Sequence, residues 1–247
     1  HVARLQDVNT RDIRDAIELG CRAMSSAFNS DDGDIPYGGA SVRPVAALGG
    51  SSEAHSPGRH LNALLNAEDA AGIRLDEDAV EKHARATFFS YSVAPLPLHR
   101  ISGRGRPVEL QDHDVREGFH ALYALTKYRS SGRARGLAEA SISTIFSYWR
   151  PEGDWDVEAL RRDLSVTGLT PGYSVFITRL ARSIGPLVKY YRATGYGPAL
   201  DLAIVLKDRA VDEAFFEDGS YDQGRFGAHC PSTTCVMSSL AQLADLT

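Results

Sequence analysis

The sequence predicts an all-α protein built from antiparallel helix hairpins that stack side by side. Three observations lead to this prediction. Apolar residues recur with a period near 3.6 along most of the chain, no stretch alternates with period two for more than a few residues, and one pattern of helix, short turn and helix recurs. Because a helix hairpin cannot bury its apolar stripes alone, we expect neighbouring hairpins to pack on one another.

The N-terminal region is expected to hold one helix and one long loop. From Asn9 to Phe28 the apolar residues follow one helix face, and Asn9 or Thr10 is the expected N-cap. Residues 29–57 are rich in Gly, Pro, Ser and Asp, a composition that predicts a long loop.

The whole chain, 1–247, is expected to form one domain, with 1–57 preceding a run of helix hairpins over 58–247. It starts without Met and stops inside a helical pattern. We therefore expect a domain that is truncated at both ends.

The remaining helices follow from periodicity and capping residues. Asp76, followed by Glu77 and Asp78, indicates a helix start, since acidic side chains are favoured in a first turn. Gly185-Pro186 predicts a kink. Helices are expected near 58–72, 77–92, 112–128, 132–148, 173–193 and 198–215, with another beginning near Ser232.

A repeated helix end suggests that the hairpins are equivalent units. Leu122–Thr126 ends one helix, Tyr190–Thr194 ends another, and Leu243–Thr247 resembles a third copy. The first two hairpins are followed by Gly/Asp-rich loops at 151–156 and 217–222. Such internal repetition is typical of stacked helical architectures.

The motif Leu-Tyr-Ala-Leu-Thr, turn, Ala-Arg-Gly-Leu-Ala-Glu, at 122–126 and 134–139, is very typical of the α/α toroid enzymes. The chain resembles this group of glycoside hydrolases, polysaccharide lyases and sugar epimerases over roughly 58–247. The resemblance implies an α/α toroid. Because the chain holds fewer hairpins than a closed ring needs, an incomplete, open toroid is the other form expected.

Composition narrows the possible partners. A net charge of −5 argues against a nucleic-acid surface, and no apolar run is long enough to span a membrane. The cysteines Cys21, Cys230 and Cys235 are too few for a disulfide framework, which fits a reducing compartment. With no visible signal peptide, we expect a cytoplasmic protein.

In a toroid the ends of the inner helices line one mouth, so polar residues at helix starts are the informative ones. His113, Arg116, Glu117 and His120 share one helix face by their spacing, and Asp112 stands beside them. A carboxylate next to His113 suits general acid–base catalysis. The alternative is that Asp112 caps the helix and Arg116 and Glu117 form a solvated face.

A second polar helix start lies at His229. Thr234-Cys235 resembles a Thr-Cys pair of the β-L-arabinofuranosidase toroids, although Thr233 stands where those enzymes carry Glu. Cys235 is therefore either a nucleophile or a residue packed inside, with Ser232 or Thr233 capping the helix. His229 precedes that cap and is the stronger candidate.

No metal site and no cofactor are predicted, because the short paired Cys or His spacings of zinc sites are missing. A zinc trio of His229 and Cys235 with His113 or His60, as in the toroid-shaped peptide cyclases, is a weaker alternative. The predicted site has His113 and His229 as acid–base groups, Asp112 and Glu117 as partner carboxylates, and Arg59, His60, Arg116, Tyr173 and Arg225 as substrate-binding residues.

With these residues at the helix starts, the resemblance to the α/α toroid enzymes implies a glycoside hydrolase or a polysaccharide lyase acting on a sugar or uronic-acid substrate by acid–base catalysis. The alternative is a non-catalytic helical-repeat binding module, or an inactive fragment of a larger toroid enzyme. An enzyme would gather the polar residues in one pocket, whereas a binding module would scatter them. Self-association is also expected, through the apolar edge formed by Val236, Leu240, Leu243 and Leu246.

Overall fold

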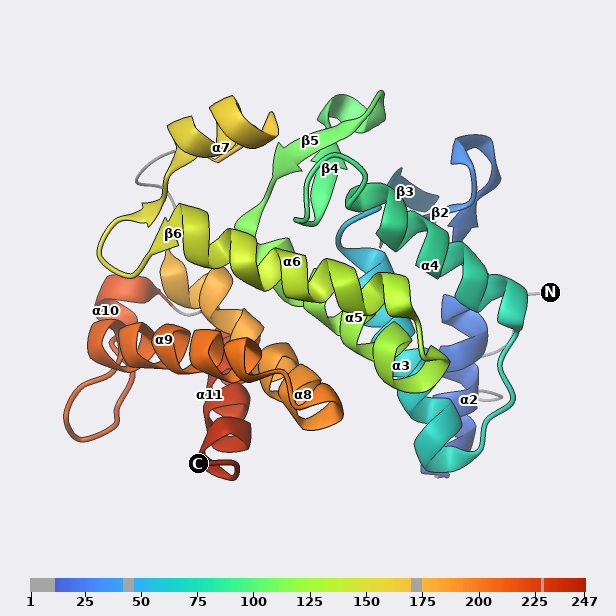
Figure 1. Ribbon diagram of the computed structural model, residues 1–247. Coiled ribbons are helices and arrows are strands. Elements are labelled where there is room, and N and C mark those ends of the chain that lie inside the picture. The colour runs from blue at the N-terminus through green and yellow to red at the C-terminus, as the bar shows by residue number, and fades with distance from the viewer. Residues whose placement is uncertain (1–11, 42–46, 170–174, 228) are drawn as a thin grey trace.

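The computed structural model describes residues 12–41, 47–169, 175–227 and 229–247. Helices make up 65% of the structure and the strands are few and short, which confirms the all-α class (Figure 1). None of the described helices is long and apolar enough to cross a membrane.

Most of the helices form two rows. In the row called inner, whose helices line a cavity, successive helices pack against one another. Each helix of the outer row packs against the inner helix that precedes it in the chain. Figure 1 shows the outer helix α6 lying in front of the inner helix α5. The inner row consists of α3 (Ser56–Ala71), α5 (Val115–Arg129), α8 (Ile184–Thr194) and α11 (Cys230–Ala244). The outer row consists of α4 (Glu77–Ser90), α6 (Gly132–Tyr148) and α9 (Gly197–Ala214).

Local sequence sets the ends of the hairpin helices. Asp76 and Ser131 precede α4 and α6, and a side-chain oxygen of each accepts a hydrogen bond from a backbone N–H in the first turn. Gly72 and Ser130 take left-handed conformations that end α3 and α5. The turns between inner and outer helices are therefore short.

One main apolar core lies between the two rows. Leu122 of α5, Ile142 of α6, Leu187 of α8 and Leu206 of α9 all belong to it and are fully buried. A second, smaller cluster joins α2 (Ile13–Met24) to α3 through Cys21. The expected N-cap at Asn9 or Thr10 lies outside the described residues, and α2 begins after the capping residue Asp12.

Inner helices approach one another closely where one of them carries glycine. A Cβ atom on Gly58 of α3 would overlap the backbone of Glu117 in α5. A Cβ atom on Gly185 of α8 would lie 2.6 Å from the Oγ atom of Ser239 in α11. Glycine therefore sets the spacing along the inner row.

The two Gly/Asp-rich loops have the same local structure. The first joins strands β6 (Trp149–Arg150) and β7 (Asp154–Trp155), and the second is closed by a bridge between Phe215 and Tyr221. Asp156 and Asp222 then begin the short helices α7 (Val157–Leu164) and α10 (Gln223–Phe226). Each Asp donates its backbone N–H to the preceding outer helix, at Tyr148 or Ala214.

The prediction of one long loop over 29–57 is wrong. Strands of this region pair in an antiparallel sheet, with Gly39 opposite Gly49. Its outer part is exposed and rich in glycine, so it lacks the apolar alternation that identifies strands. The strands are β1 (Phe28–Asn29), β2 (Ile35–Ser41) and β3 (Ala47–Ser51), and a separate hairpin follows α4, formed by β4 (Leu98–Arg100) and β5 (Pro107–Leu110).

The helix predicted from Tyr173 to Ala193 is shorter than expected. Two 3₁₀ turns, η4 (Phe176–Thr178) and η5 (Leu180–Ser183), precede α8, which begins at Ile184. Pro186 lies in the first turn of α8, where proline costs little because the first N–H groups of a helix lack intrahelical partners. It therefore marks the start of a helix and not a kink within one.

Candidate functional site

The residues Asp112, His113 and Asp114 form a 3₁₀ turn, η3 (Asp112–Asp114), that connects β5 to α5. Consecutive side chains of this turn take different directions. Asp112 accepts a hydrogen bond of 2.8 Å from Arg179, while Asp114 accepts from histidines of two other segments. Burial raises the pKa of the Asp112 carboxyl, and the hydrogen bond from Arg179 opposes that shift.

Three imidazoles surround the buried Asp114 carboxylate. His55 Nδ1 donates to Oδ1, His99 Nε2 donates to Oδ2 at 2.6 Å, and His113 Nε2 lies 3.2 Å from Oδ1. We call these four residues the histidine cluster. Burial would raise the pKa of Asp114, but the hydrogen bonds from His55 and His99 outweigh it and hold that pKa well below its usual range. Asp114 is therefore ionised at neutral pH.

An arginine cluster, formed by Arg59, Arg116 and Arg182, surrounds Glu117 in the neighbouring turn of α5. The Glu117 side chain is fully buried, and its Oε1 atom accepts hydrogen bonds from Arg59 at 3.1 Å, Arg116 at 2.6 Å and Arg182 at 3.1 Å. Its second oxygen has no hydrogen-bond partner among the described residues. One carboxylate thus meets three guanidinium groups, which leaves an excess of positive charge.

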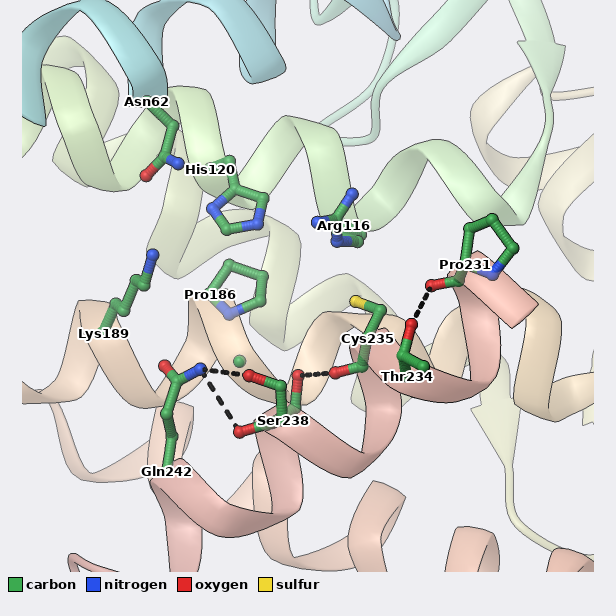
Figure 2. Close-up of a pocket in the computed structure, with 12 residues that line it drawn as sticks. Asn62, Arg116, His120, Pro186, Lys189, Pro231, Thr234, Cys235, Ser238 and Gln242 are labelled. Atoms are coloured by element: carbon green, nitrogen blue, oxygen red, sulfur yellow. Dashed lines mark hydrogen bonds between the residues drawn. The ribbon is translucent and has the colours of Figure 1, made fainter. Parts of the chain in front are cut away.

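Two cavities of about 510 and 350 Å³ lie beside the arginine cluster. They share the lining residues Asn62, Arg116, His120, Pro231 and Cys235, and we call them together the cationic pocket. All four inner helices contribute to its wall. In Figure 2, His120 and Arg116 of α5 lie opposite Cys235 of α11. Other residues of the wall include Arg59, Arg182 and Lys189.

The pocket is short of compensating negative charge. Among the described residues that line the two cavities, none is Asp or Glu. Burial lowers the pKa of Lys189, and the nearby Arg116 lowers it further. Burial also holds the pKa of His120 well below its ordinary value, with help from the same arginine. Both groups therefore lose protons more easily than they would in water.

Five of the predicted site residues lie at the start of α5 or contact it. Arg59, Arg116 and Glu117 meet directly, and Asp112 and His113 occupy the preceding turn. Burial lowers the pKa of His113, an effect that the charges of Asp114 and Glu117 partly offset. Their catalytic and binding roles stay predictions.

The other predicted residues have different surroundings. The ring of His60 packs 4.8 Å from that of His83 on α4. His229 is exposed and its Nδ1 atom lies 2.7 Å from the Oγ atom of Ser232. The guanidinium of Arg225 lies over Phe226. Tyr173 lies outside the described residues.

Several residues of the site were not predicted from the sequence. His99 lies in a short strand, Arg182 in the 3₁₀ turn η5 and Lys189 within α8. No regular sequence spacing connects these residues to α5. His55 and Asp114 occupy N-cap positions, yet neither side chain caps its helix. An N-cap His beside Ser, Pro and Gly was the one signal available for His55.

The chain matches no known protein-family model, no curated protein and no solved structure. The geometry of these residues is therefore what indicates a function.

Proposed function

We propose that this chain is a carbohydrate-active enzyme whose cationic pocket binds the carboxylate of a uronic-acid substrate. The observation that carries the proposal is the group of Arg59, Arg116, Arg182 and Lys189 at one pocket, with Glu117 as the carboxylate that they surround. Guanidinium groups suit carboxylates because their N–H donors match both oxygens. A bound anion would relieve the repulsion among the three guanidinium groups.

The volume of the pocket fits this reading. Its larger cavity, about 510 Å³, falls within the range of small-molecule sites. The wall also holds neutral polar groups, such as Asn62 and Gln242, that can bind sugar hydroxyls. Because arginines line the same wall, a negatively charged saccharide is favoured over a neutral one.

Elimination is favoured over hydrolysis as the reaction. Glycoside hydrolases commonly place two carboxyl groups on either side of the scissile bond, one of which donates a proton. Here the Oε1 atom of Glu117 is occupied by three arginines, and no Asp or Glu lines the two cavities among the described residues, so no pair of carboxyl groups flanks the pocket. In β-elimination, arginines that bind the substrate carboxylate stabilise the negative charge that develops beside it.

The base of such a reaction would be a neutral group in the pocket wall. Lys189 and His120 both have lowered pKa values, which favours their neutral forms. One of them would remove the proton on C5 of the uronate. The electrons of that C–H bond form a C4=C5 double bond, and the bond from C4 to the glycosidic oxygen breaks. The departing oxygen takes a proton from water or from the protonated base, which completes the cleavage.

The packing order of the helices supports an open α/α toroid as the finer description of the fold. Each outer helix follows an inner helix, and the inner helices contact one another in chain order. The pocket lies on the inner row, as in a toroid enzyme. A non-catalytic helical-repeat module is the rival, and turnover separates the two.

The test is an assay of uronic-acid oligosaccharides against neutral ones of the same length. Elimination is followed by the ultraviolet absorbance of the new double bond, and hydrolysis by the release of reducing ends. Arg116→Gln and Lys189→Met should each lower turnover by about a hundredfold or more, the scale expected for loss of charge stabilisation or a general base. Arg161→Gln, on the exposed face of α7, is the matched control.

Turnover of the acidic substrates alone, lost in both pocket variants and kept in the control, would support the proposal. Equal rates in the wild type and both pocket variants would exclude this pocket as the active site. If binding of acidic oligosaccharides occurs without turnover, the binding module replaces the enzyme.

A further inference from the structure

The histidine cluster brings metal-binding atoms together at the starts of α3 and α5. A ring nitrogen of His55, a ring nitrogen of His113 and an Asp114 carboxylate oxygen all lie within 4.8 Å of one another. The planes of the two imidazole rings make an angle of 69°, and their centroids lie 5.5 Å apart. Both nitrogens are directed to the same oxygen, Oδ1 of Asp114. Two nitrogens and one carboxylate oxygen thus converge on one point.

We propose that His55, His113 and Asp114 bind a divalent transition-metal ion, with Zn²⁺ favoured. Two imidazoles and a carboxylate are a common zinc donor set, and the same set with open positions binds Fe²⁺ in other proteins. This site lies outside the cationic pocket, and the proposal does not depend on the uronate-binding function.

The positions of the ligands on the backbone support this role. His55 and Asp114 are the N-cap residues of α3 and α5, and neither uses its side chain to cap the helix. Helix starts commonly gain stability from such a cap. Both side chains are instead turned toward each other between the two helix ends. A bound ion would join the starts of two inner helices.

His99 supplies the outer contact that metal sites usually contain. Its Nε2 atom lies 2.6 Å from Oδ2 of Asp114, the oxygen that the other two histidines leave free. Such a hydrogen bond fixes the orientation of a ligating carboxylate. His99 is thus a positioning residue and not a ligand.

An ion can reach this site from solvent. The side chains of His55 and His113 are 23% and 31% exposed, whereas Asp114 is fully buried beneath them. Three protein ligands leave a fourth position for water, the arrangement of catalytic rather than structural zinc sites. With a metal bound, His113 would act as a ligand and not as the acid–base group that the sequence suggests.

The test uses the metal alone as the probe. Protein treated with a chelator is titrated with Zn²⁺ by calorimetry and with Co²⁺ by visible absorption, where strong bands indicate four-coordination. We expect one ion per chain. His55→Ala and His113→Gln should each weaken binding by about a hundredfold, and His99→Ala by about ten- to a hundredfold. Circular dichroism of each variant checks that the fold is kept.

The control is His229→Ala, an exposed histidine next to Cys230 that could bind zinc through a different pair of ligands. It should keep the wild-type affinity. The proposal is overturned if the wild type binds no ion, or if His113→Gln and His55→Ala bind as tightly as the wild type. It is equally overturned if the His229 variant is the one that loses binding.

Discussion

Gly58 of α3 and Glu117 of α5 are in direct backbone contact, so close that no side chain fits between them. This contact brings Arg59, the next residue of α3, within 3.1 Å of the Glu117 carboxylate. The spacing of two helices and the geometry of the arginine cluster therefore depend on the same glycine.

Gly58→Ala should destabilise the protein, because its methyl group would overlap the backbone of Glu117, which cannot move as a side chain can. Overpacking of this kind costs about 1–3 kcal/mol or more. Urea unfolding measures the change. Gly136→Ala is the control: this glycine lies within α6 with open space around its Cβ position, so its substitution should stabilise the protein by about 0.5–1 kcal/mol. Similar losses of stability in both variants would contradict the close contact between Gly58 and Glu117.

Glu117→Gln should cost several kcal/mol of folding stability, because it leaves the buried Arg182 and the partly buried Arg116 without their counter-charge. Breaking a buried ion pair costs about 3–5 kcal/mol. Added sulfate or galacturonate should restore more stability to this variant than to the wild type, since an anion can replace the lost carboxylate. Thermal unfolding with and without the anion measures this. Glu158→Gln, which breaks an exposed pair with Arg161, should change stability by less than about 1 kcal/mol.

Acid should destabilise the protein through His83. Burial lowers the pKa of His83 to about 3, and its Nε2–H donates to the Met24 carbonyl at 3.1 Å. An unfolded histidine has a pKa of about 6.5, so between these values the unfolded chain binds a proton that the folded chain does not. Stability should therefore fall as pH decreases through this window, by up to about 1.4 kcal/mol per pH unit.

Replacing His83 with Gln keeps a donor for Met24 and removes the titrating group, so it should make unfolding less dependent on pH across that window. His229→Gln, at an exposed position, is the matched control for the substitution itself. Denaturant midpoints measured from about pH 7 to about pH 4 decide the matter. An unchanged slope in the His83 variant would show that other groups cause the acid sensitivity.

Asp156→Ala and Asp222→Ala should have similar effects. Each Asp accepts a hydrogen bond from a backbone N–H three residues later, at 2.9 Å from Ala159 and 3.0 Å from Arg225. Loss of such a cap costs about 1 kcal/mol. Chemical unfolding compares the two variants. A large difference between them would indicate that the two loops do not have equivalent structural roles.

Sequence periodicity was sufficient for most of the hairpin helices. The helix predicted at 132–148 has those bounds in the structure, because Ser131 caps it and its apolar stripe is unbroken. Before α8 the apolar pattern continues through two 3₁₀ turns, so periodicity alone placed the helix start too early. The exposed Gly-rich strands β2 and β3 gave no periodic signal, because their pairing depends on backbone hydrogen bonds and not on an apolar face.

Sequence spacing likewise predicted some residues of the site and missed others. Arg116 and Glu117 were predicted because they occupy one helix face with His113, a local relationship that spacing reveals. The contacts of Glu117 with Arg182 and of Asp114 with His99 join different elements of the fold. These contacts depend on how the inner helices pack together, and periodicity along a single helix does not predict them.

The four inner helices that line the cationic pocket are separated by outer helices and loops in the sequence. A growing polypeptide would therefore hold the arginines of α3 and α5 long before the wall formed by α11 is made. If the cationic pocket binds acidic saccharides as proposed, partly folded chains should have little affinity for them, and binding would show that folding has reached α11. Ligand binding at this pocket would then distinguish completely folded chains from partly folded ones.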